Sequence, residues 1–389
     1  MTAEKLGVGM VGYAFMGAAH SQAWRNVNRF FPLPIEAELI AVAGRNADAV
    51  AAAAAKFGFA STETDWRTLI NREDVAIVDV CTPGDTHAEI SIAALKAGKH
   101  VLCEKPLANS VDEARAMAAA AHDAPGKAMV GFNYRRVPAA SFARQLIADG
   151  RLGTIRHVRA VYLQDWIIDP EFPLTWRLQK DKAGSGALGD LGAHIVDLTQ
   201  FLTGQQITGV SALTETFIRE RPLPEVASGL AASGSATGRG EVTVDDAALF
   251  LARFSGGAVG AFEATRFAQG RKNGLRVEIN GDGGSLVFDL ERLNELEFLD
   301  ASQDPSEVGF RRILVTEPTH PYVGAWWPPG HILGYEHSFT HEMRDFLQAI
   351  ADDVQPAPSF ADGLRVQLVL DAVTRSAEAN SVWTPIEES

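Results

Sequence analysis

A lysine and a later aspartate–histidine pair are the side chains of this chain best suited to acid–base chemistry. Lys105 stands in the tripeptide Glu104-Lys105-Pro106 after an apolar run, and Asp190 and His194 follow a glycine-rich stretch. A histidine with a pKa near neutrality can take the proton of a hydroxyl group, and an ammonium group can stabilise the alkoxide that develops. These residues together predict a site that deprotonates an alcohol, with Glu104 orienting the lysine.

Each of these groups also has a purely structural interpretation. A lysine beside a glutamate is usually a surface pair, and an isolated Asp-x-x-x-His is more often a helix N-terminus with a satisfied histidine. If residues 187–203 form one helix, Asp190 and His194 share a face of it. Such a pair would also suit zinc or manganese, but no third ligand is evident, so no metal site is predicted. Close approach of the backbone to a ligand is expected at the three preceding glycines, Gly184, Gly186 and Gly189.

A glycine-containing turn near the N-terminus predicts a dinucleotide cofactor. The sequence Gly12-Tyr13-Ala14-Phe15-Met16-Gly17 follows the apolar run 6–11 and opens a helical pattern. In such a strand–turn–helix the glycines permit the turn and the close packing, and the helix N-terminus binds the pyrophosphate. The chain departs from the pattern at the middle glycine, which is replaced by Ala14. The expected cofactor contacts in this turn are Gly12, Ala14, Phe15, Met16 and Gly17.

The residues that follow the second apolar run, 38–43, bear on whether the cofactor is NAD or NADP. An acidic residue there accepts hydrogen bonds from the ribose of NAD, whereas an arginine can bind the 2′-phosphate of NADP. Gly44 and Arg45 occupy the position and no acid is present. We therefore expect either NAD or NADP as cofactor, with Gly44 and Arg45 in its site. An equal alternative is that Arg45 is only a solvated residue of the next helix.

The elements that must position these residues alternate in the first third of the chain. Apolar runs predict buried parallel strands at 6–11, 38–43, 75–81, 100–103 and 128–132. Helical patterns separate them at 17–30, 47–57, 86–97 and 110–122. Asn46 offers an N-cap to the second helix, and Gly58 offers its stop. This pattern predicts an α/β fold whose first domain, 1–132, is a Rossmann-type doubly wound parallel sheet with Lys105 at a strand's carboxyl end.

The remaining residues, 133–389, predict an α+β domain for substrate binding and oligomerisation. Its large open sheet should be mainly antiparallel, with strands at 155–163, 210–217, 247–254, 258–265, 276–280 and 285–288 and glycine turns at 256–257 and 281–284. Helices are expected at 187–203, 335–351 and 360–379. Residues 221–242 and 303–333 are predicted to be loops.

Composition excludes several other classes of protein. The chain has 389 residues and a formal net charge of −14, with no basic cluster, which argues against nucleic acid and anionic membranes as partners. No apolar stretch is long enough for a membrane span and no signal peptide is evident, so we expect a cytoplasmic protein. The two cysteines, Cys81 and Cys103, have neither disulfide nor zinc spacing and are expected to be buried thiols.

These motifs resemble those of the glucose–fructose oxidoreductase/inositol dehydrogenase/MocA family over nearly the whole chain. The resemblance rests on Gly12–Gly17, Thr82-Pro83 with His87, Glu104-Lys105-Pro106, Phe132-Asn133-Tyr134-Arg135, and Asp190 with His194. It implies a catalytic set of Lys105, Asp190 and His194, and a homodimer or homotetramer formed through the C-terminal sheet. It also implies cofactor contacts at Thr82, Pro83, His87, Glu104 and Lys105.

One subgroup of this family oxidises the 3-hydroxyl of a pyranose-like ring with NAD. The shared stretches are Tyr134-Arg135-Arg136, residues 162–166, Trp176-Arg177, residues 184–190 and residues 263–266. The resemblance implies that the substrate contacts Lys105, Tyr134, Arg135, Gln164, Trp166, Arg177, Asp190 and His194. An aromatic face with amide and guanidinium donors suits a sugar, although core packing explains Trp166 and Trp176 equally well.

Three functions are therefore compared. The first is an NAD(P)-dependent dehydrogenase or reductase acting on a secondary alcohol of a sugar, anhydrosugar, glycoside or inositol, with His194 as the base and Lys105 as its electrostatic partner. The second is a redox-neutral glycosidase or lyase that works through a 3-keto intermediate. The third is a cofactor-sensing binding protein, which would have no need of Lys105, Asp190 and His194.

Overall fold

The structure is a computed structural model that describes residues 3–224 and 238–387. It divides into two compact units. Met1–Arg136 and Gly334–Leu364 form the first, and Val137–Leu333 and Arg365–Ser389 form the second. No helix in the described ranges is long and apolar enough to cross a membrane.

The first unit is built on a six-stranded sheet in the order β3-β2-β1-β4-β5-β6, with every neighbouring pair parallel. The crossing of strand order at β1 is that of a doubly wound sheet, which confirms the predicted Rossmann-type fold. Residues of β4 and β6 are buried on both faces, as their continuous apolar runs predict. The strands are β1 (Glu4–Val11), β2 (Ile35–Ala43), β3 (Ser61–Glu63), β4 (Ile77–Val80), β5 (His100–Glu104) and β6 (Ala128–Gly131).

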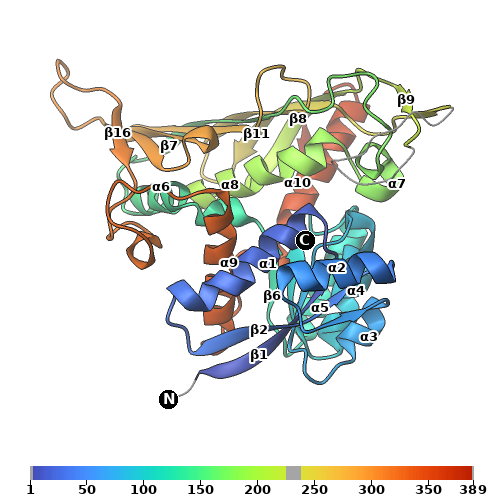
Figure 1. The fold of residues 1–389 in the computed structure, drawn as a ribbon. Coiled ribbons are helices and arrows are strands. Elements are labelled where there is room, and N and C mark those ends of the chain that lie inside the picture. Colours follow the sequence, from blue (N-terminus) through green and yellow to red (C-terminus); the bar gives the residue numbers. More distant parts are fainter. Residues whose placement is uncertain (1–2, 225–237, 388–389) are drawn as a thin grey trace. The chain divides into compact units, whose positions relative to one another are not determined.

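Helix α2 of this unit begins and ends at residues that cap it. Asn46 accepts a hydrogen bond from the Ala49 N–H at the start of α2, and Gly58 ends the helix in the left-handed conformation, so both predicted caps are confirmed. Helix α4 packs against α3 and α5 (Figure 1). These helices are α1 (Phe15–Phe30), α2 (Ala47–Phe57), α3 (Trp66–Ile70), α4 (His87–Lys96) and α5 (Val111–Asp123).

A helix from late in the chain, α9 (Tyr335–Ala351), completes the first unit by packing against α1. Asn133 donates to the Ser338 hydroxyl over 2.8 Å, and the His341 ring contacts the Arg136 carbonyl at 2.9 Å. The sequence pattern predicts this helix but groups it with residues 133–389. Its contacts place it with the first unit, because the chain returns to the parallel sheet after building the second unit.

The second unit is built on a nine-stranded sheet in the order β16-β15-β14-β13-β7-β12-β11-β8-β17. All neighbouring pairs are antiparallel except β12 with β7, which confirms the predicted, mainly antiparallel sheet. The strands are β7 (Ile155–Leu163), β8 (Ile207–Glu215), β11 (Ala247–Phe254), β12 (Val259–Thr265), β13 (Gly274–Gly281), β14 (Gly284–Asp289), β15 (Glu295–Asp300), β16 (Arg311–Leu314) and β17 (Thr384–Pro385).

Both predicted loops contain regular structure. Residues 303–333 include β16, which extends the sheet, so the loop prediction is wrong there. Residues 221–242 include the end of β9 (Glu220–Pro222) and the whole of β10 (Arg239–Glu241), which pair with each other. The rest of that prediction, residues 225–237, lies outside the described residues. Strands of three or four residues carry too little periodicity to predict.

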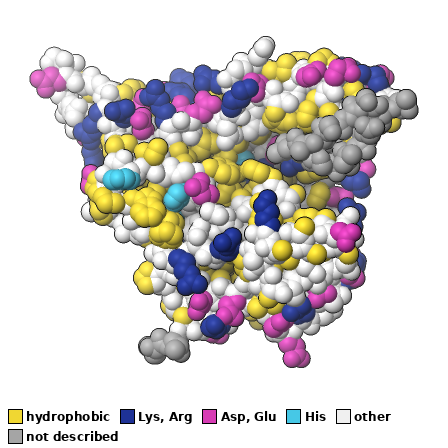
Figure 2. Space-filling model, in the orientation of Figure 1, with side chains coloured by type: hydrophobic (Ala, Val, Ile, Leu, Met, Phe, Trp, Pro, Cys, Tyr) yellow, Lys and Arg dark blue, Asp and Glu magenta, His cyan; other side chains and the backbone are white. Residues whose placement is uncertain are grey.

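One face of the nine-stranded sheet is covered by helices and the other is exposed. Helix α6 (Pro138–Ala148) packs against β14 and β15, and α8 (Ala193–Thr203) packs against β7. Leu213, Leu249 and Leu251 project outward from β8 and β11 and are 43–59% exposed. Arg159 pairs with Glu278 farther along the same face, and Figure 2 shows cationic and anionic side chains mixed over these strands.

Helix α9 also buries a carboxyl group, Glu342, which is 0% exposed. Neither carboxyl oxygen has a hydrogen-bond partner among the described residues, and the nearest cation, Arg136 Nη1, is 3.8 Å from Oε1. Burial raises the pKa of Glu342 from 4.5 to about 8, against the opposing charges of Arg136 and His20. The folded protein therefore holds this proton at pH values where the unfolded chain has lost it.

This difference predicts a pH dependence of stability that Glu342→Gln removes. Between pH 4.5 and 8 unfolding releases the proton, so the contribution of Glu342 to the free energy of unfolding falls as pH rises, by up to about 1.4 kcal/mol per pH unit. Urea unfolding at pH 5 and pH 8 should show the advantage of Glu342→Gln over the parent growing with pH. Glu336→Gln, an exposed substitution on the same helix, is the control, and a constant advantage of Glu342→Gln would contradict the prediction.

Candidate active site

The turn between β1 and α1 has the backbone geometry of a dinucleotide-binding turn. Gly12 adopts φ +95°, and a Cβ atom there would lie 2.6 Å from the Cys81 carbonyl oxygen. A Cβ atom on Gly17 would lie 2.5 Å from the Gly12 carbonyl oxygen, so the helix packs as closely as predicted. Ala14, which replaces the usual glycine, has φ −74° and ψ −152°. Any residue can adopt that conformation, so the replacement causes no backbone strain.

The start of α1 is suited to an anionic group. Its N-cap, Ala14, offers no side-chain hydrogen bond, and no acidic residue occupies the first turn. The first amide groups of a helix have no partner within the helix and carry partial positive charge, so they fit a pyrophosphate. Gly44 packs directly on this turn, because a Cβ atom there would lie 2.0 Å from the Tyr13 ring, and Arg45 follows it with an exposed side chain.

Strands β4 and β5 each lead into a segment of the predicted site, and the buried side chain of His87 connects the two segments. His87 contacts the Thr82 carbonyl at 2.9 Å through Nε2 and the Pro106 carbonyl at 3.0 Å through Nδ1. This ring therefore ties the Thr82-Pro83 segment to the Glu104-Lys105-Pro106 segment. The family resemblance implies that His87 contacts the cofactor. In the structure, both ring nitrogens of His87 face backbone carbonyls of the protein.

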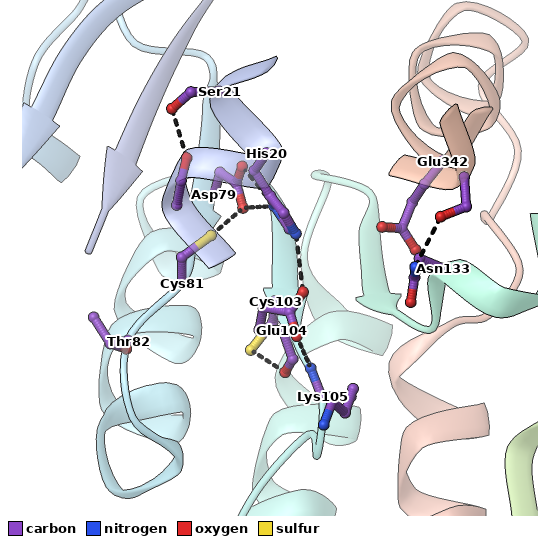
Figure 3. Close-up of polar contacts among 12 residues, drawn as sticks. His20, Ser21, Asp79, Cys81, Thr82, Cys103, Glu104, Lys105, Asn133 and Glu342 are labelled. Atoms are coloured by element: carbon purple, nitrogen blue, oxygen red, sulfur yellow. Dashed lines mark hydrogen bonds and ion pairs between the residues drawn. The ribbon is translucent and has the colours of Figure 1, made fainter. Parts of the chain in front are cut away.

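A second buried histidine, His20 on α1, is linked to Lys105 through Glu104 (Figure 3). Its Nδ1 is 3.0 Å from both carboxyl oxygens of Asp79, and its Nε2 is 2.9 Å from Glu104 Oε1. The other oxygen of Glu104 accepts the backbone N–H of Lys105 over 3.0 Å. Glu104 thus holds the backbone of Lys105, and the orientation of the lysine side chain by Glu104 stays a prediction. Sequence reasoning missed His20 and Asp79, and the only signal was one acidic residue inside an apolar strand.

In the second unit, Asp190 lies in a π-helical turn, Leu188–Gly192, that runs directly into α8. The prediction of one regular helix over 187–203 is wrong in this first turn, and π-helical turns are frequent at functional sites. The turn begins where Asp245 accepts the N–H groups of Gly186 and Leu188 over 2.7 and 2.8 Å. A Cβ atom on Gly186 would lie 1.7 Å from the Asp245 carbonyl oxygen. Only a glycine at this position leaves room for the backbone at Asp245, just before β11.

Arg266 fixes the position of Asp190. It is 1% exposed, and its Nη2 donates to Asp190 Oδ2 over 3.1 Å and to the Gly186 carbonyl over 2.9 Å. Its guanidinium carbon is 5.4 Å from the centre of the Trp166 ring, and Nη1 donates to the Arg177 carbonyl over 3.4 Å. Sequence analysis names Arg266 only as part of a shared stretch. Its position directly after β12 gave no sign of this contact.

The other predicted substrate residues of this unit form a hydrogen-bonded row. The Trp166 indole donates to Gln164 over 2.9 Å, and Gln164 donates to Asn273 over 2.8 Å. Tyr162 donates to the same Asn273 oxygen over 2.7 Å. The Tyr162 ring lies edge-on to the ring of His194, which is 7% exposed, with centroids 5.8 Å apart. Sequence analysis missed Asn273, which lies in a loop.

Arg177 joins this group through the aromatic and charged neighbours of its guanidinium. The guanidinium carbon is 4.3 Å from the centre of the Trp176 ring. Burial lowers the pKa of Arg177, and the charge of Asp190 opposes that shift. The remaining predicted residues belong to the first unit, where Lys105 follows β5 and the buried Tyr134 ring lies 6.5 Å from the Tyr335 ring, with Arg135 next in the chain.

Comparison with known proteins matches both units to family descriptions. The description "Oxidoreductase family, NAD-binding Rossmann fold" matches residues 6–132, and "GFO/IDH/MocA C-terminal domain" matches residues 141–287. The chain is 44% identical to levoglucosan dehydrogenase of Pseudarthrobacter phenanthrenivorans over 99% of both chains. It is 27% identical to inositol 2-dehydrogenase of Rhizobium meliloti, over 95% of this chain and 96% of that one.

Solved structures give the same result. An oxidoreductase domain protein from Kribbella flavida is 64% identical, with a TM-score of 0.94 over 99% of this chain and 100% of that one. Levoglucosan dehydrogenase in complex with NADH and levoglucosan is 43% identical, with a TM-score of 0.93 over the same shares. The family resemblance drawn from the sequence motifs is confirmed.

The geometry of the turn predicts that Gly12→Ala weakens NADH binding. The substitution forces a side chain into a left-handed conformation and against the Cys81 carbonyl, so the dissociation constant should rise about tenfold or more. Fluorescence titration with NADH measures it.

Gly58→Ala is the matched control for this substitution. Gly58 has φ +85°, but a Cβ atom there would have nothing within 4 Å. The control should lower stability and leave NADH binding unchanged. Equal NADH affinity in Gly12→Ala and the parent would refute the assignment of the turn.

Proposed function

Because the chain belongs to the GFO/IDH/MocA family of NAD-binding oxidoreductases, we propose that it oxidises a secondary hydroxyl group of a pyranose-like anhydrosugar, with levoglucosan as the first candidate. NAD bound at the β1–α1 turn would accept the hydride. By resemblance, the group oxidised is the 3-hydroxyl. The reverse reaction, reduction of the ketone, uses the same residues.

The observation that carries this proposal is the group of aromatic, amide and guanidinium side chains linked to Asp190 through Arg266. Trp166 supplies an aromatic ring, Gln164 an amide group and Arg177 a guanidinium group. Arg266 contacts the Trp166 ring, the Arg177 carbonyl and the Asp190 carboxylate. Apolar ring faces with convergent hydrogen-bonding groups suit a polyhydroxylated ring. These residues lie in a chain that is 44% identical to a levoglucosan dehydrogenase.

We assign the chemical steps to the three residues named from the sequence. His194 takes the hydroxyl proton, and the Lys105 ammonium group stabilises the oxygen as negative charge develops on it. Asp190 is held as an acceptor by Arg266 and binds a hydroxyl group of the ring. The relatives named above are dehydrogenases or oxidoreductases, so no observation favours the redox-neutral glycosidase or lyase.

The exposed leucines of the nine-stranded sheet support a further part of the proposal, a homodimer or homotetramer. Leu213, Leu249 and Leu251 stand on two adjacent strands. Apolar side chains grouped in this way on a sheet face suit contact with a second copy.

The test is the absorbance of reduced nicotinamide, followed with purified protein, NAD or NADP, and a panel of levoglucosan, glucosides and inositols. We expect turnover with levoglucosan and NAD. Lys105→Ala should lower turnover about a hundredfold or more while NADH binding is retained, because the oxygen loses its stabilising charge. Lys96→Ala, an exposed substitution on α4, is the control. Unchanged turnover in Lys105→Ala, or cleaved sugar without net NADH, would reject the proposal.

Arg266 supplies a separate prediction for the second unit. Arg266→Met should lower kcat/KM for the sugar about a hundredfold, since Asp190 loses its fixed orientation, and NADH affinity should stay unchanged. Combining it with Asp190→Asn should add little further loss, because both substitutions remove one interaction. Arg271→Met, which removes an exposed arginine paired with Glu291, is the control. Full additivity of the two losses would contradict this role of Arg266.

A further inference from the structure

The ring of His20 is enclosed between two carboxyl groups from neighbouring strands (Figure 3). Asp79 lies in β4 and Glu104 ends β5, and His20 reaches both from α1. His20 and Asp79 are 0% exposed and Glu104 is 4% exposed. The ring nitrogens lie 3.0 Å from Asp79 and 2.9 Å from Glu104, so each nitrogen is within hydrogen-bond distance of a carboxyl oxygen.

The donors around these carboxyl groups favour a ring that is protonated at both nitrogens. A neutral imidazole donates at one nitrogen only and would turn its other lone pair toward a carboxyl oxygen. Asp79 already accepts the Trp24 indole N–H over 2.7 Å, and the Cys81 thiol lies 3.4 Å from its other oxygen. Glu104 accepts the Lys105 N–H through its second oxygen. Both carboxyl groups therefore act as acceptors, and an imidazolium satisfies both.

The surrounding groups agree with a cationic ring. Burial lowers the pKa of His20, but the charge and the hydrogen bond of Asp79 outweigh burial and, with a contribution from Cys81, raise the pKa well above its ordinary value. From α9, the ring of Phe339 lies 5.5 Å from the His20 ring, and Tyr335 and Glu342 also face the network. Glu342 stays protonated to about pH 8, so it adds no charge there at neutral pH.

A bound metal ion is the competing explanation for this cluster. Ligand atoms of His20, Asp79 and Cys81 lie within 4.8 Å of one another. Asp79 is, however, occupied by the indole N–H of Trp24 as well as by His20. Burial also raises the pKa of the Cys81 thiol well above its ordinary value, so the thiolate that a metal requires is disfavoured.

We infer that His20 is a positioning residue for Lys105. Its imidazolium fixes one oxygen of Glu104, and the other oxygen of Glu104 fixes the backbone N–H of Lys105. Since His20 belongs to α1, a charge-assisted hydrogen bond joins the helix that starts at the cofactor turn to the segment that carries the lysine. The inference rests on the proposed role of Lys105 in the reaction.

Nitrogen-15 NMR of protein with labelled histidine rings tests the protonation directly. The chain has ten histidines, so the His20 signals are assigned by their loss in His20→Gln. Both ring nitrogens of His20 should carry protons at pH 6, 7 and 8. One nitrogen without a proton in this range would overturn the inference, as would one metal ion per chain in elemental analysis of the purified protein.

Kinetics with His20→Phe test the connection to Lys105. Without the cation, the buried Glu104 carboxylate loses the charged partner of its Oε1, and burial then favours the neutral carboxyl group, which is a poorer acceptor for the Lys105 N–H. We expect kcat to fall about tenfold or more, and its decline as pH is lowered from 8 to 6 to be steeper than the parent's. Adding Glu104→Gln should remove this new pH dependence, since the amide oxygen accepts the N–H at every pH. Should His20→Phe fail to fold, His20→Gln takes its place in the same comparison.

Further controls separate this inference from the proposed function. His122→Gln, at an exposed position, should change neither kcat nor its pH profile. A lower kcat with the parent's pH profile in His20→Phe would mean that His20 acts only in packing and would overturn the inference. If Lys105→Ala keeps full turnover while the NMR signals show a doubly protonated His20, the proposed role of Lys105 fails and the cation assignment stands.

Discussion

The carboxylate of Glu104 is the constraint on which the site of the first unit depends. It is buried, so its charge must be compensated by neighbours, and the neighbours are the His20 ring and the backbone of Lys105. His87 adds a second restraint on the same segment, at the Pro106 carbonyl. The lysine is thus held through its own main chain and the residues beside it. The proposed role of its ammonium group requires a backbone that is fixed in this way.

The second unit uses the same principle with a different cation. Arg266 is buried and holds the carboxylate of Asp190, as His20 holds the carboxylate of Glu104. Asp245 caps the entrance of the π-helical turn, and Arg266 binds the Gly186 carbonyl at the same place. Breaking the buried His20–Glu104 pair would leave a charge without its partner, which costs more than the pair itself contributes. Breaking the pair in the second unit would leave the buried guanidinium of Arg266 without Asp190. Each unit therefore holds one carboxylate with a buried cationic side chain.

Local signals in the sequence predict much of this fold. The apolar runs locate the parallel strands, and Asn46 and Gly58 are the caps of α2. The motifs also predict Lys105, Asp190 and His194, because each stands beside glycines or at a strand end. The π-helical turn at Asp190 was not predictable, since it depends on contacts with Asp245 and Arg266, more than fifty residues later.

His20 and Arg266 escaped sequence analysis for the same physical reason. Each contacts its carboxylate across 76 or more residues of chain, and neither position has a local pattern that marks it. A buried charge is visible in sequence only as a polar residue in an apolar setting, such as Asp79 in β4. That residue signals that a partner exists, but the identity of the partner follows from strand order and from the return of α9, which no periodicity reveals.

The hydrogen bonds of Asp190 also indicate which residue binds a hydroxyl group and which takes the proton in the proposed reaction. A carboxylate that accepts from a buried guanidinium is stabilised in its ionised form, and an ionised carboxylate can only accept hydrogen bonds. It is therefore suited to receive a hydroxyl hydrogen bond and fix the ring. It is a weak base in that form, because the cation favours the charged state. His194, whose ring lies against Tyr162, is of the residue type best suited to take up a proton near neutral pH, and the proposed reaction therefore assigns it the proton that leaves.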